Sequence, residues 1–342
     1  MKNPIKLQTF IFFLVTILHN NHLAKAQPPI TINPYEFLHI IPNPDGSITR
    51  IKEFFPTVPP NTTTSLAISK DVPLNPYKKT WVRLYLPSGL SGPPGYLNNL
   101  PIVVFAHGGA FVLLSTATPD IDLFLSNTAS KLHVLVVSVE YRLAPEHRLP
   151  AAYDDVLEAL YWVKDKKDEW VGKYGDVSRC IMMGESVGGN IVYNVGLRAS
   201  VLTRVLKPLV IRGLVLIQPF YGGGNLNRGY KDPNIEVVAD LLWNLSLPLG
   251  ANWNNPYFNP TFGGGSSNLD IIRRLGWRVA FAGCDGDFIF DKQLKVFEFF
   301  KGRGLDVIGY FGRGYYHGVF VEDPSESQKI FEFVRYVFSS YI

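Results

Sequence analysis

Ser186 is the residue of this sequence best placed for covalent chemistry. It stands in the motif Gly184-Glu185-Ser186-Val187-Gly188, directly after an apolar run. A serine becomes a nucleophile when it is held on a tight strand-to-helix turn beside a base that accepts its proton. Glycines flank such a serine because side chains there would collide with neighbouring elements. The alternative is an ordinary turn in which Ser186 caps a helix.

His317 is the only histidine that can serve Ser186 as the base. In hydrolases built around this motif, an acid and then a histidine follow the serine along the chain. The sequence has seven histidines, and only His317 lies after Ser186. It stands in the segment 312–318, which the pattern predicts to be a loop after a strand. A histidine in a loop is commonly an ordinary polar residue, but no other one occupies the required place.

Two aspartates can complete the set. Cys284-Asp285-Gly286-Asp287 follows an apolar run, so both carboxylates would lie where a strand ends. We choose Asp287, with Asp285 as the runner-up. Such an acid holds the histidine in its useful tautomer and stabilises its charged form. The competing interpretation is that either aspartate caps the helix expected to begin near Asp291.

A glycine pair could supply backbone N–H groups to an oxyanion. His107-Gly108-Gly109 follows the apolar run 102–106, and a glycine backbone can approach a substrate carbonyl closely. The N–H groups of Gly108, Gly109 and Val187 are therefore predicted to form an oxyanion hole. Without that role, the pair would belong to a plain glycine-rich turn.

An α/β architecture would place all of these residues at one edge of a sheet. Continuous apolar runs are typical of parallel strands buried on both faces, and helical periods lie between them. This alternation predicts a mostly parallel sheet with helices on both faces and ligands at the carboxyl ends of the strands. The expected strands are 81–86, 102–106, 134–139, 180–183, 209–217, 277–283 and 305–311, and the expected helices are 152–171, 190–199, 291–302 and 326–341.

Two segments interrupt this alternation. Residues 27–79 are rich in Pro, Asn and Thr and are interpreted as an N-terminal arm. Residues 221–268 carry two glycine triplets and are interpreted as an insertion above the sheet. We expect both to form a cap on a single domain that spans residues 27–342.

The first 26 residues are typical of a secretory signal peptide. Lys2 and Lys6 precede a short apolar run, and Ala24-Lys25-Ala26 supplies a cleavage pattern. The run is too short to span a bilayer, and an uncleaved membrane anchor is the alternative. We therefore expect a secreted or vacuolar protein with no membrane partner after cleavage. Its sequons at Asn61 and Asn244 would be glycosylated where they are exposed.

Charge and cysteine content exclude other classes of protein. Loss of the leader removes three lysines and no acid, so the formal charge falls from +4 to +4 − 3 = +1. No basic block remains, so no nucleic-acid partner is expected. Cys180 and Cys284 fall in different strands, placed too far apart for a disulfide. We expect two buried free thiols and no metal site.

Several motifs together resemble those of plant carboxylesterases of the hormone-sensitive-lipase-like branch of the α/β-hydrolase fold. The likeness runs from about Asn33 to the carboxyl terminus. The motifs that carry it are His107-Gly108-Gly109, the segments SVEYRLAPEH at 138–147 and LPAAYDD at 149–155, Gly184-x-Ser186-x-Gly188-Gly189-Asn190, and the N-terminal segments 34–38 and 43–50.

This resemblance implies an eight-stranded sheet and a serine esterase without a cofactor, with Ser186, Asp287 and His317 as its triad. It favours Asp287 over Asp285, because Asp287 and Asp291 match the family's Asp-x-x-x-Asp, whose first member is catalytic. The substrate would be a small or medium carboxylic ester. Relatives in plant specialised metabolism include dehydratases, cyclases and acyl transferases, so a non-hydrolytic enzyme acting on a natural product is the main alternative. A receptor similar to the gibberellin receptors is the other, although those lack the histidine.

The sequence departs from the family pattern beside the predicted site. Ala110 replaces the third glycine of the usual His-Gly-Gly-Gly, which adds a methyl group beside the oxyanion hole. Glu185 and Val187 replace an aspartate and an alanine around the nucleophile, and the β-branched Val187 would adjoin the acyl pocket. We expect Ala110, Phe111 and Glu185 to line the substrate pocket. The signal peptide is also unusual, because most members look cytosolic.

Overall fold

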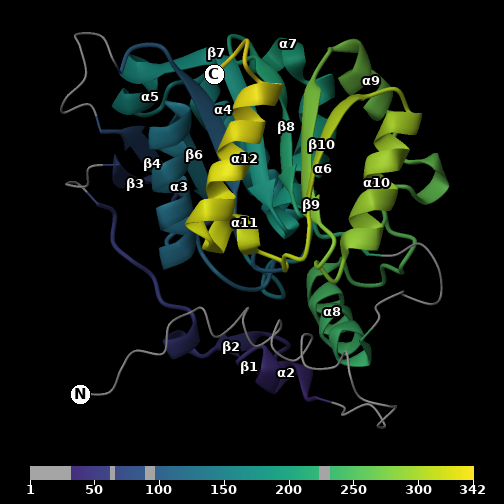
Figure 1. Cartoon of the computed structure of the whole chain (residues 1–342). Coiled ribbons are helices and arrows are strands. Elements are labelled where there is room, and N and C mark those ends of the chain that lie inside the picture. Colours follow the sequence, from purple (N-terminus) through teal and green to yellow (C-terminus); the bar gives the residue numbers. More distant parts are fainter. Residues whose placement is uncertain (1–31, 62–65, 89–96, 223–231) are drawn as a thin grey trace.

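A single eight-stranded sheet forms the centre of the molecule in the computed structural model, which describes residues 32–61, 66–88, 97–222 and 232–342 (Figure 1). Its strand order is β10-β9-β8-β7-β5-β6-β4-β3. All neighbouring pairs are parallel except those of β4, which is antiparallel to β3 and β6. The strands are β3 (Ala67–Asn75), β4 (Thr80–Pro87), β5 (Leu100–Ala106), β6 (Leu135–Glu140), β7 (Gly175–Glu185), β8 (Ile211–Ile217), β9 (Arg278–Cys284) and β10 (Asp306–Gly312).

Burial on both faces explains the continuous apolar runs of the central strands. Successive side chains of a strand point to opposite faces of the sheet. In β5, Ile102 and Val104 join one helical layer of the core, whereas Val103 and Phe105 join the other. Because every position meets a helix, polar side chains are excluded along the whole strand. The predicted mostly parallel sheet is confirmed.

Helices cover both faces of this sheet. The core layer that contains Val103 and Phe105 is closed by α3 (Pro119–Leu132), α11 (Val319–Glu322) and α12 (Pro324–Val337). The opposite layer is closed by α4 (Ala151–Lys164), α5 (Glu169–Tyr174), α6 (Val187–Val201), α7 (Thr203–Leu206), α9 (Leu269–Arg274) and α10 (Phe290–Gly302). The expected helical layers are therefore present.

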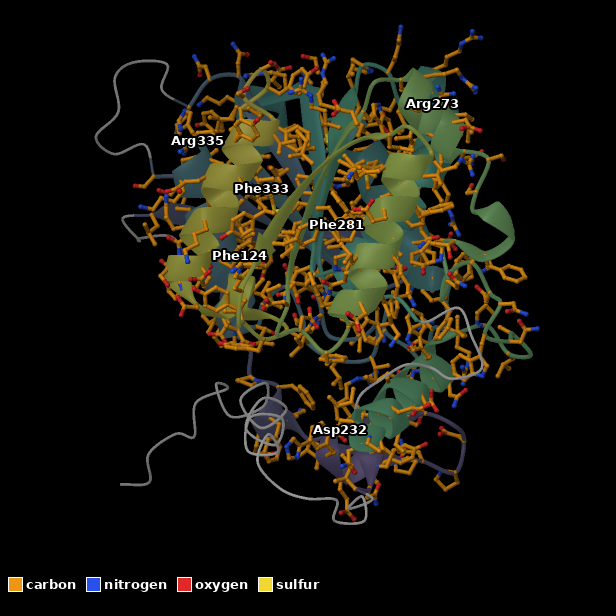
Figure 2. The ribbon with its side chains drawn as sticks, turned by 45° about the vertical axis from the view of Figure 1, so that its right-hand side comes forward. Phe124, Asp232, Arg273, Phe281, Phe333 and Arg335 are labelled. Carbon is orange, nitrogen blue, oxygen red and sulfur yellow. The ribbon has the colours of Figure 1, made fainter. Side chains whose placement is uncertain are left out.

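A cap lies beyond the carboxyl ends of the strands (Figure 1). Its apolar core joins side chains of the N-terminal arm and of α8 to Val112 and Leu113, which follow β5. In Figure 2, Asp232 marks the α8 side of this cap, and Arg273 lies at the opposite end of the molecule. The cap elements are α2 (Pro34–Phe37), β1 (Ile40–Pro42), β2 (Ile48–Arg50), a short 3-10 helix (Lys52–Phe54) and α8 (Pro233–Ser246).

The structure corrects two predicted boundaries. The end of the segment 27–79 is not part of the arm, because Ala67–Asn75 forms the edge strand β3 of the main sheet. An edge strand pairs on one side only, so its residues alternate in burial and include Lys70 and Asp71. The helix expected over 152–171 is two helices. The chain turns at Lys166, whose φ of 50° is left-handed, and Asp168 caps α5.

Several further predictions concern the surface, the thiols and the chain start. Cys180 and Cys284 are buried and unpaired, as expected. Asn244 is exposed on α8, whereas Asn61 is half-buried. The predicted signal peptide, 1–26, lies outside the described residues. None of the helices described is long and apolar enough to cross a membrane.

Arg50 fastens the N-terminal arm to the loops that follow β5 and β6. Its Nε donates a hydrogen bond to the Val112 carbonyl at 2.6 Å, and its Nη2 donates one to the Ala144 carbonyl at 2.7 Å. The same nitrogen lies 2.9 Å from a carboxylate oxygen of Glu146. One guanidinium therefore satisfies two backbone acceptors and one charge across the boundary between cap and sheet.

Replacing Arg50 should loosen this boundary. We expect Arg50→Ala to lower the free energy of unfolding by about 2 kcal/mol, because two carbonyls and a partly buried carboxylate lose their donor. Lys301→Ala is the control, since Lys301 pairs with Glu298 at 3.7 Å on the exposed surface and should contribute less than about 1 kcal/mol. Equal losses in urea denaturation would contradict the role given to Arg50.

Candidate active site

Ser186 lies on a strained turn between β7 and α6. Its backbone has φ 55° and ψ −122°, a combination that a non-glycine residue adopts only when its surroundings hold it there. A Cβ on Gly188 would come within 2.0 Å of the Ala106 carbonyl oxygen, and one on Gly184 within 2.2 Å of the Gly188 oxygen. The Ser186 side chain makes no capping hydrogen bond to α6. The hydroxyl is therefore not occupied as a helix cap.

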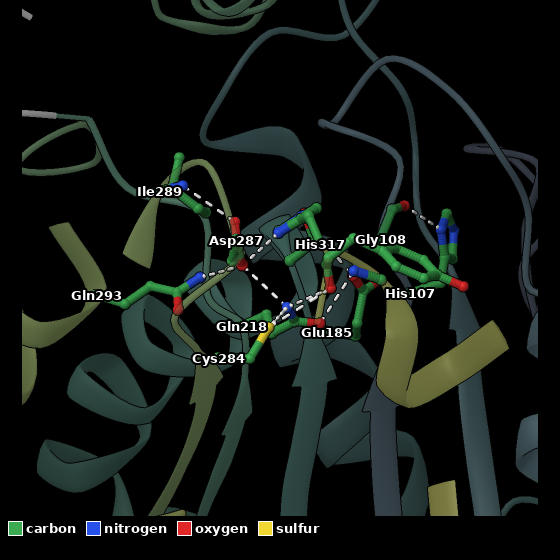
Figure 3. Close-up of polar contacts among 12 residues, drawn as sticks. His107, Gly108, Glu185, Gln218, Cys284, Asp287, Ile289, Gln293 and His317 are labelled. Carbon is green, nitrogen blue, oxygen red and sulfur yellow. Dashed lines mark hydrogen bonds and ion pairs between the residues drawn. The ribbon is translucent and has the colours of Figure 1, made fainter. Parts of the chain in front are cut away.

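His317 joins Ser186 to Asp287 in one chain of hydrogen bonds. Figure 3 shows the contact between His317 and Asp287. The Ser186 Oγ–H donates to His317 Nε2 at 2.8 Å, and His317 Nδ1–H donates to Asp287 Oδ2 at 2.8 Å. These three residues come from the ends of β7, β10 and β9. Parallel strands thus bring together groups that are 101 and 30 positions apart along the chain (287 − 186 and 317 − 287).

Asp287 is held by more donors than the histidine alone. Its Oδ2 also accepts from Gln218 Nε2 and Gln293 Nε2, each at 2.9 Å, and its Oδ1 accepts from the Ile289 N–H at 3.0 Å. The runner-up Asp285 is exposed and accepts instead from the Gly314 N–H at 2.5 Å. Only Asp287 therefore reaches His317.

Gln218 is a residue of this site that sequence reasoning missed. It follows β8, and besides Asp287 its amide nitrogen donates to the Tyr316 carbonyl at 3.0 Å. Its amide oxygen accepts from the Gly318 N–H at 2.9 Å, so one side chain holds the backbone on both sides of His317. The sequence signal that could have identified Gln218 was its position directly after an apolar strand, because ligands bind at the carboxyl ends of parallel strands.

The glycine loop after β5 lies against the Ser186 turn. A Cβ on Gly108 would lie 3.4 Å from the Ser186 Cβ, so the two backbones approach closely. His107 is buried beneath them, and burial lowers the pKa of its imidazole to about 4. Its Nδ1 bonds the Gly108 carbonyl at 2.8 Å. Within the part of the chain that is described, no group accepts a hydrogen bond from the N–H of Gly108, Gly109 or Val187.

A cavity of about 160 Å³ opens above Ser186 and His317. Its walls are mostly apolar and come from the arm, the glycine loop and α8. Ala110 and Glu185 line it as expected, but the placement of Phe111 is wrong. Phe111 is buried and packs on Tyr153 and Trp243, because its left-handed φ of 64° turns the loop back toward the core. The methyl groups of Val187 are likewise buried in the core, away from the cavity.

Carboxylates dominate the electrostatics of this cavity. Burial raises the pKa of Glu185 to about 7, although the nearby His317 favours its charged form. Burial alone would lower the pKa of His317, but the negative charges of Asp287, Glu185 and Glu322 outweigh it and raise the pKa above its ordinary value. No cluster of the described residues could hold a metal ion.

The fold and the Ser186 turn define a hydrolase class. A model of the alpha/beta hydrolase fold family matches residues 103–321. A solved arylesterase structure superposes with a TM-score of 0.62 and 21% sequence identity, covering 82% of this chain and 87% of that one. The chain belongs to the α/β-hydrolase family.

Curated relatives narrow this class. Carboxylesterase 20 of Arabidopsis thaliana is 43% identical over 324 residues, which are 92% of this chain and 99% of that protein. A tulip relative, tuliposide A-converting enzyme 1, chloroplastic, of Tulipa gesneriana, is 35% identical over 237 residues, 67% of this chain and 58% of that protein. Within the α/β hydrolases, the chain is thus placed among the plant carboxylesterases of the hormone-sensitive-lipase-like branch, and it is a carboxylic-ester hydrolase. The predicted family is confirmed.

The pH dependence of activity should reveal the charge of Glu185. A base must be neutral to accept a proton, so kcat/KM should fall as the pH falls through the pKa of His317. Glu185 Oε1 lies 3.9 Å from His317 Nε2 and raises that pKa. Glu185→Gln removes the charge, so the acid limb of the pH profile should move to lower pH. An unmoved limb would contradict this coupling. The exposed Glu298→Gln is the control and should leave the limb in place.

Proposed function

We propose that the chain is a serine carboxylesterase in which Ser186, His317 and Asp287 act as nucleophile, base and orienting acid. The observation that carries this proposal is the hydrogen-bonded chain from the Ser186 hydroxyl through His317 to Asp287, on a strained turn beside a cavity. The substrate is a small or medium carboxylic ester, in keeping with the cavity of about 160 Å³.

In the acylation step, Ser186 Oγ attacks the ester carbonyl carbon and His317 Nε2 takes the hydroxyl proton. The resulting oxyanion accepts hydrogen bonds from the N–H groups of Gly108, Gly109 and Val187, which have no acceptor among the described residues. Collapse of this intermediate breaks the bond to the alcohol, which leaves with the proton from His317.

In the deacylation step, His317 removes a proton from water while the water oxygen attacks the acyl-enzyme carbonyl. Collapse of this second intermediate breaks the bond to Ser186 Oγ, which takes the proton back from His317, and the carboxylic acid is released. Asp287 stabilises the imidazolium that forms in both steps. The two glutamine amides and the backbone N–H that bond it support this role, because they hold its carboxyl group in position against His317.

We further propose that residues 1–26 are a cleaved secretory leader. The basic start, the apolar run and Ala24-Lys25-Ala26 support export. Exposure of Asn244 on α8 would allow glycosylation of that sequon, and Asn61 is the second candidate. The tulip relative is named as chloroplastic. The proposed compartment of this chain therefore rests on its own N-terminal sequence and not on that relative.

The decisive test is whether removal of the Ser186 Oγ atom abolishes ester hydrolysis. We expect the unsubstituted protein to hydrolyse p-nitrophenyl acetate and to be labelled by a fluorophosphonate. Ser186→Ala should lose labelling and at least about a thousandfold in kcat/KM, because nothing else supplies the nucleophile. The exposed Ser339→Ala is the control and should change neither. Hydrolysis that survives Ser186→Ala would sink the acyl-enzyme mechanism.

A further inference from the structure

Four carboxyl groups line the cavity without a part in the proposed ester chemistry. Glu185 ends β7, Asp120 lies in the first turn of α3, and Glu322 ends the short helix α11. Asp232, just before α8, lines the same cavity from the cap. Among the described residues that line it there is no lysine or arginine. The walls therefore combine apolar surface with negative charge on several sides.

Glu185 is the most buried of these groups and lacks a hydrogen-bond donor. It is 8% exposed, and no described residue donates a hydrogen bond to its carboxylate. The nearest basic atom is His317 Nε2 at 3.9 Å (Figure 3), and that nitrogen already bonds Ser186. A Cβ on Gly108 would lie 2.1 Å from Glu185 Oε2, so the carboxyl group lies against the glycine loop. A carboxyl group whose one basic neighbour is His317, at 3.9 Å, thus lies at the reacting end of the cavity among the described residues.

Burial of these acids in apolar walls is costly unless a ligand compensates for it. Burial, together with the neighbouring charges of Asp120 and Glu185, raises the pKa of Glu322 to about 8. The hydrogen bond from Tyr316 and the nearby His317 oppose this shift without cancelling it. A positive charge in the cavity would stabilise all three carboxylates.

The shape of the site favours an organic cation over a metal ion. The carboxyl groups are not clustered tightly enough for any set of three described residues to hold a metal ion. The same cavity is lined by apolar side chains and by the aromatic rings of Phe220 and Phe288, whose faces can contact alkyl groups or a cation. The ring of Phe288 is 5.1 Å from that of His317, so such a contact would lie close to the reacting bond.

We infer that the cavity selects esters that carry a protonated amine, with Glu185, Glu322 and Asp120 as the groups that recognise its charge. This inference rests on the proposed esterase function, which supplies the reaction at Ser186. The carboxylates do not enter the bond-breaking steps; they position a cationic ester and disfavour an anionic one. The substrate class is therefore amine esters.

Two acetate esters of nearly the same shape test this selectivity. We expect 2-(dimethylamino)ethyl acetate, which is protonated at neutral pH, to exceed its neutral analogue 3-methylbutyl acetate in kcat/KM by about tenfold or more. Glu322→Gln keeps the shape of the side chain and should lower that ratio severalfold. Asp120→Asn should lower it in the same direction and serves if Glu322→Gln does not fold. The exposed Glu298→Gln should leave the ratio unchanged, which excludes a general effect of net charge.

Binding to Ser186→Ala separates this inference from the esterase function. Calorimetry should show the cationic ester binding about tenfold or more tightly than the neutral one, without turnover. Tight binding of the cation to Ser186→Ala, with no hydrolysis by the unsubstituted protein, would keep the amine site and overturn the esterase. Hydrolysis of both esters at equal efficiency, with equal affinities, would keep the esterase and overturn the amine site. A ratio that Glu322→Gln and Asp120→Asn both leave unchanged would also overturn it.

Discussion

The close approach of α6 to the end of β5 is the constraint on which the rest of the site depends. No side chain fits at Gly188, because a Cβ there would meet the Ala106 carbonyl at 2.0 Å. The start of α6 therefore lies directly against the sheet. Ser186, which precedes it, has strained backbone dihedrals that only the surrounding packing can hold. The same contact brings the glycine loop beside Ser186, since that loop begins where β5 ends. One packing contact therefore positions both Ser186, the proposed nucleophile, and the N–H groups proposed as oxyanion donors.

The histidine loop needs a separate support, because it lies at the far side of the sheet order from β5. Gln218 supplies it by bonding Asp287 together with the backbone before and after His317. The cap is fastened by different means, chiefly the apolar contacts of α8 and the guanidinium of Arg50. The proposed chemistry thus lies at the edge of the sheet, whereas the arm and α8 supply part of the cavity wall. Substrate choice can change by substitution in the cap without disturbing the hydrogen-bonded chain.

Sequence patterns predicted those features that depend on local periodicity and chain order. The parallel strands were predictable because burial on both faces removes polar residues, and His317 because no other histidine follows Ser186. The edge strand β3 was missed because an edge carries charge and proline like a loop. Gln218 and the orientation of Phe111 depend on contacts between distant segments, which periodicity does not encode. Asp120 and Glu322 were not predicted to line the cavity for the same reason, since α3 and α11 come into contact only in the folded chain.

The carboxylates of the cavity have two opposing effects on His317 when no cation is bound. Asp287 contributes most to the raised pKa of the imidazole, and the charges of Glu185 and Glu322 add to it. A raised pKa strengthens His317 as a base but increases its protonated, inactive fraction. A positive charge bound beside Glu185 and Glu322 would oppose that effect and return His317 to the neutral form. Substrate binding would then prepare the base for proton transfer as well as position the ester. A neutral ester offers no such compensation, so the same carboxylates that attract an amine would also make the enzyme less active toward substrates that lack one.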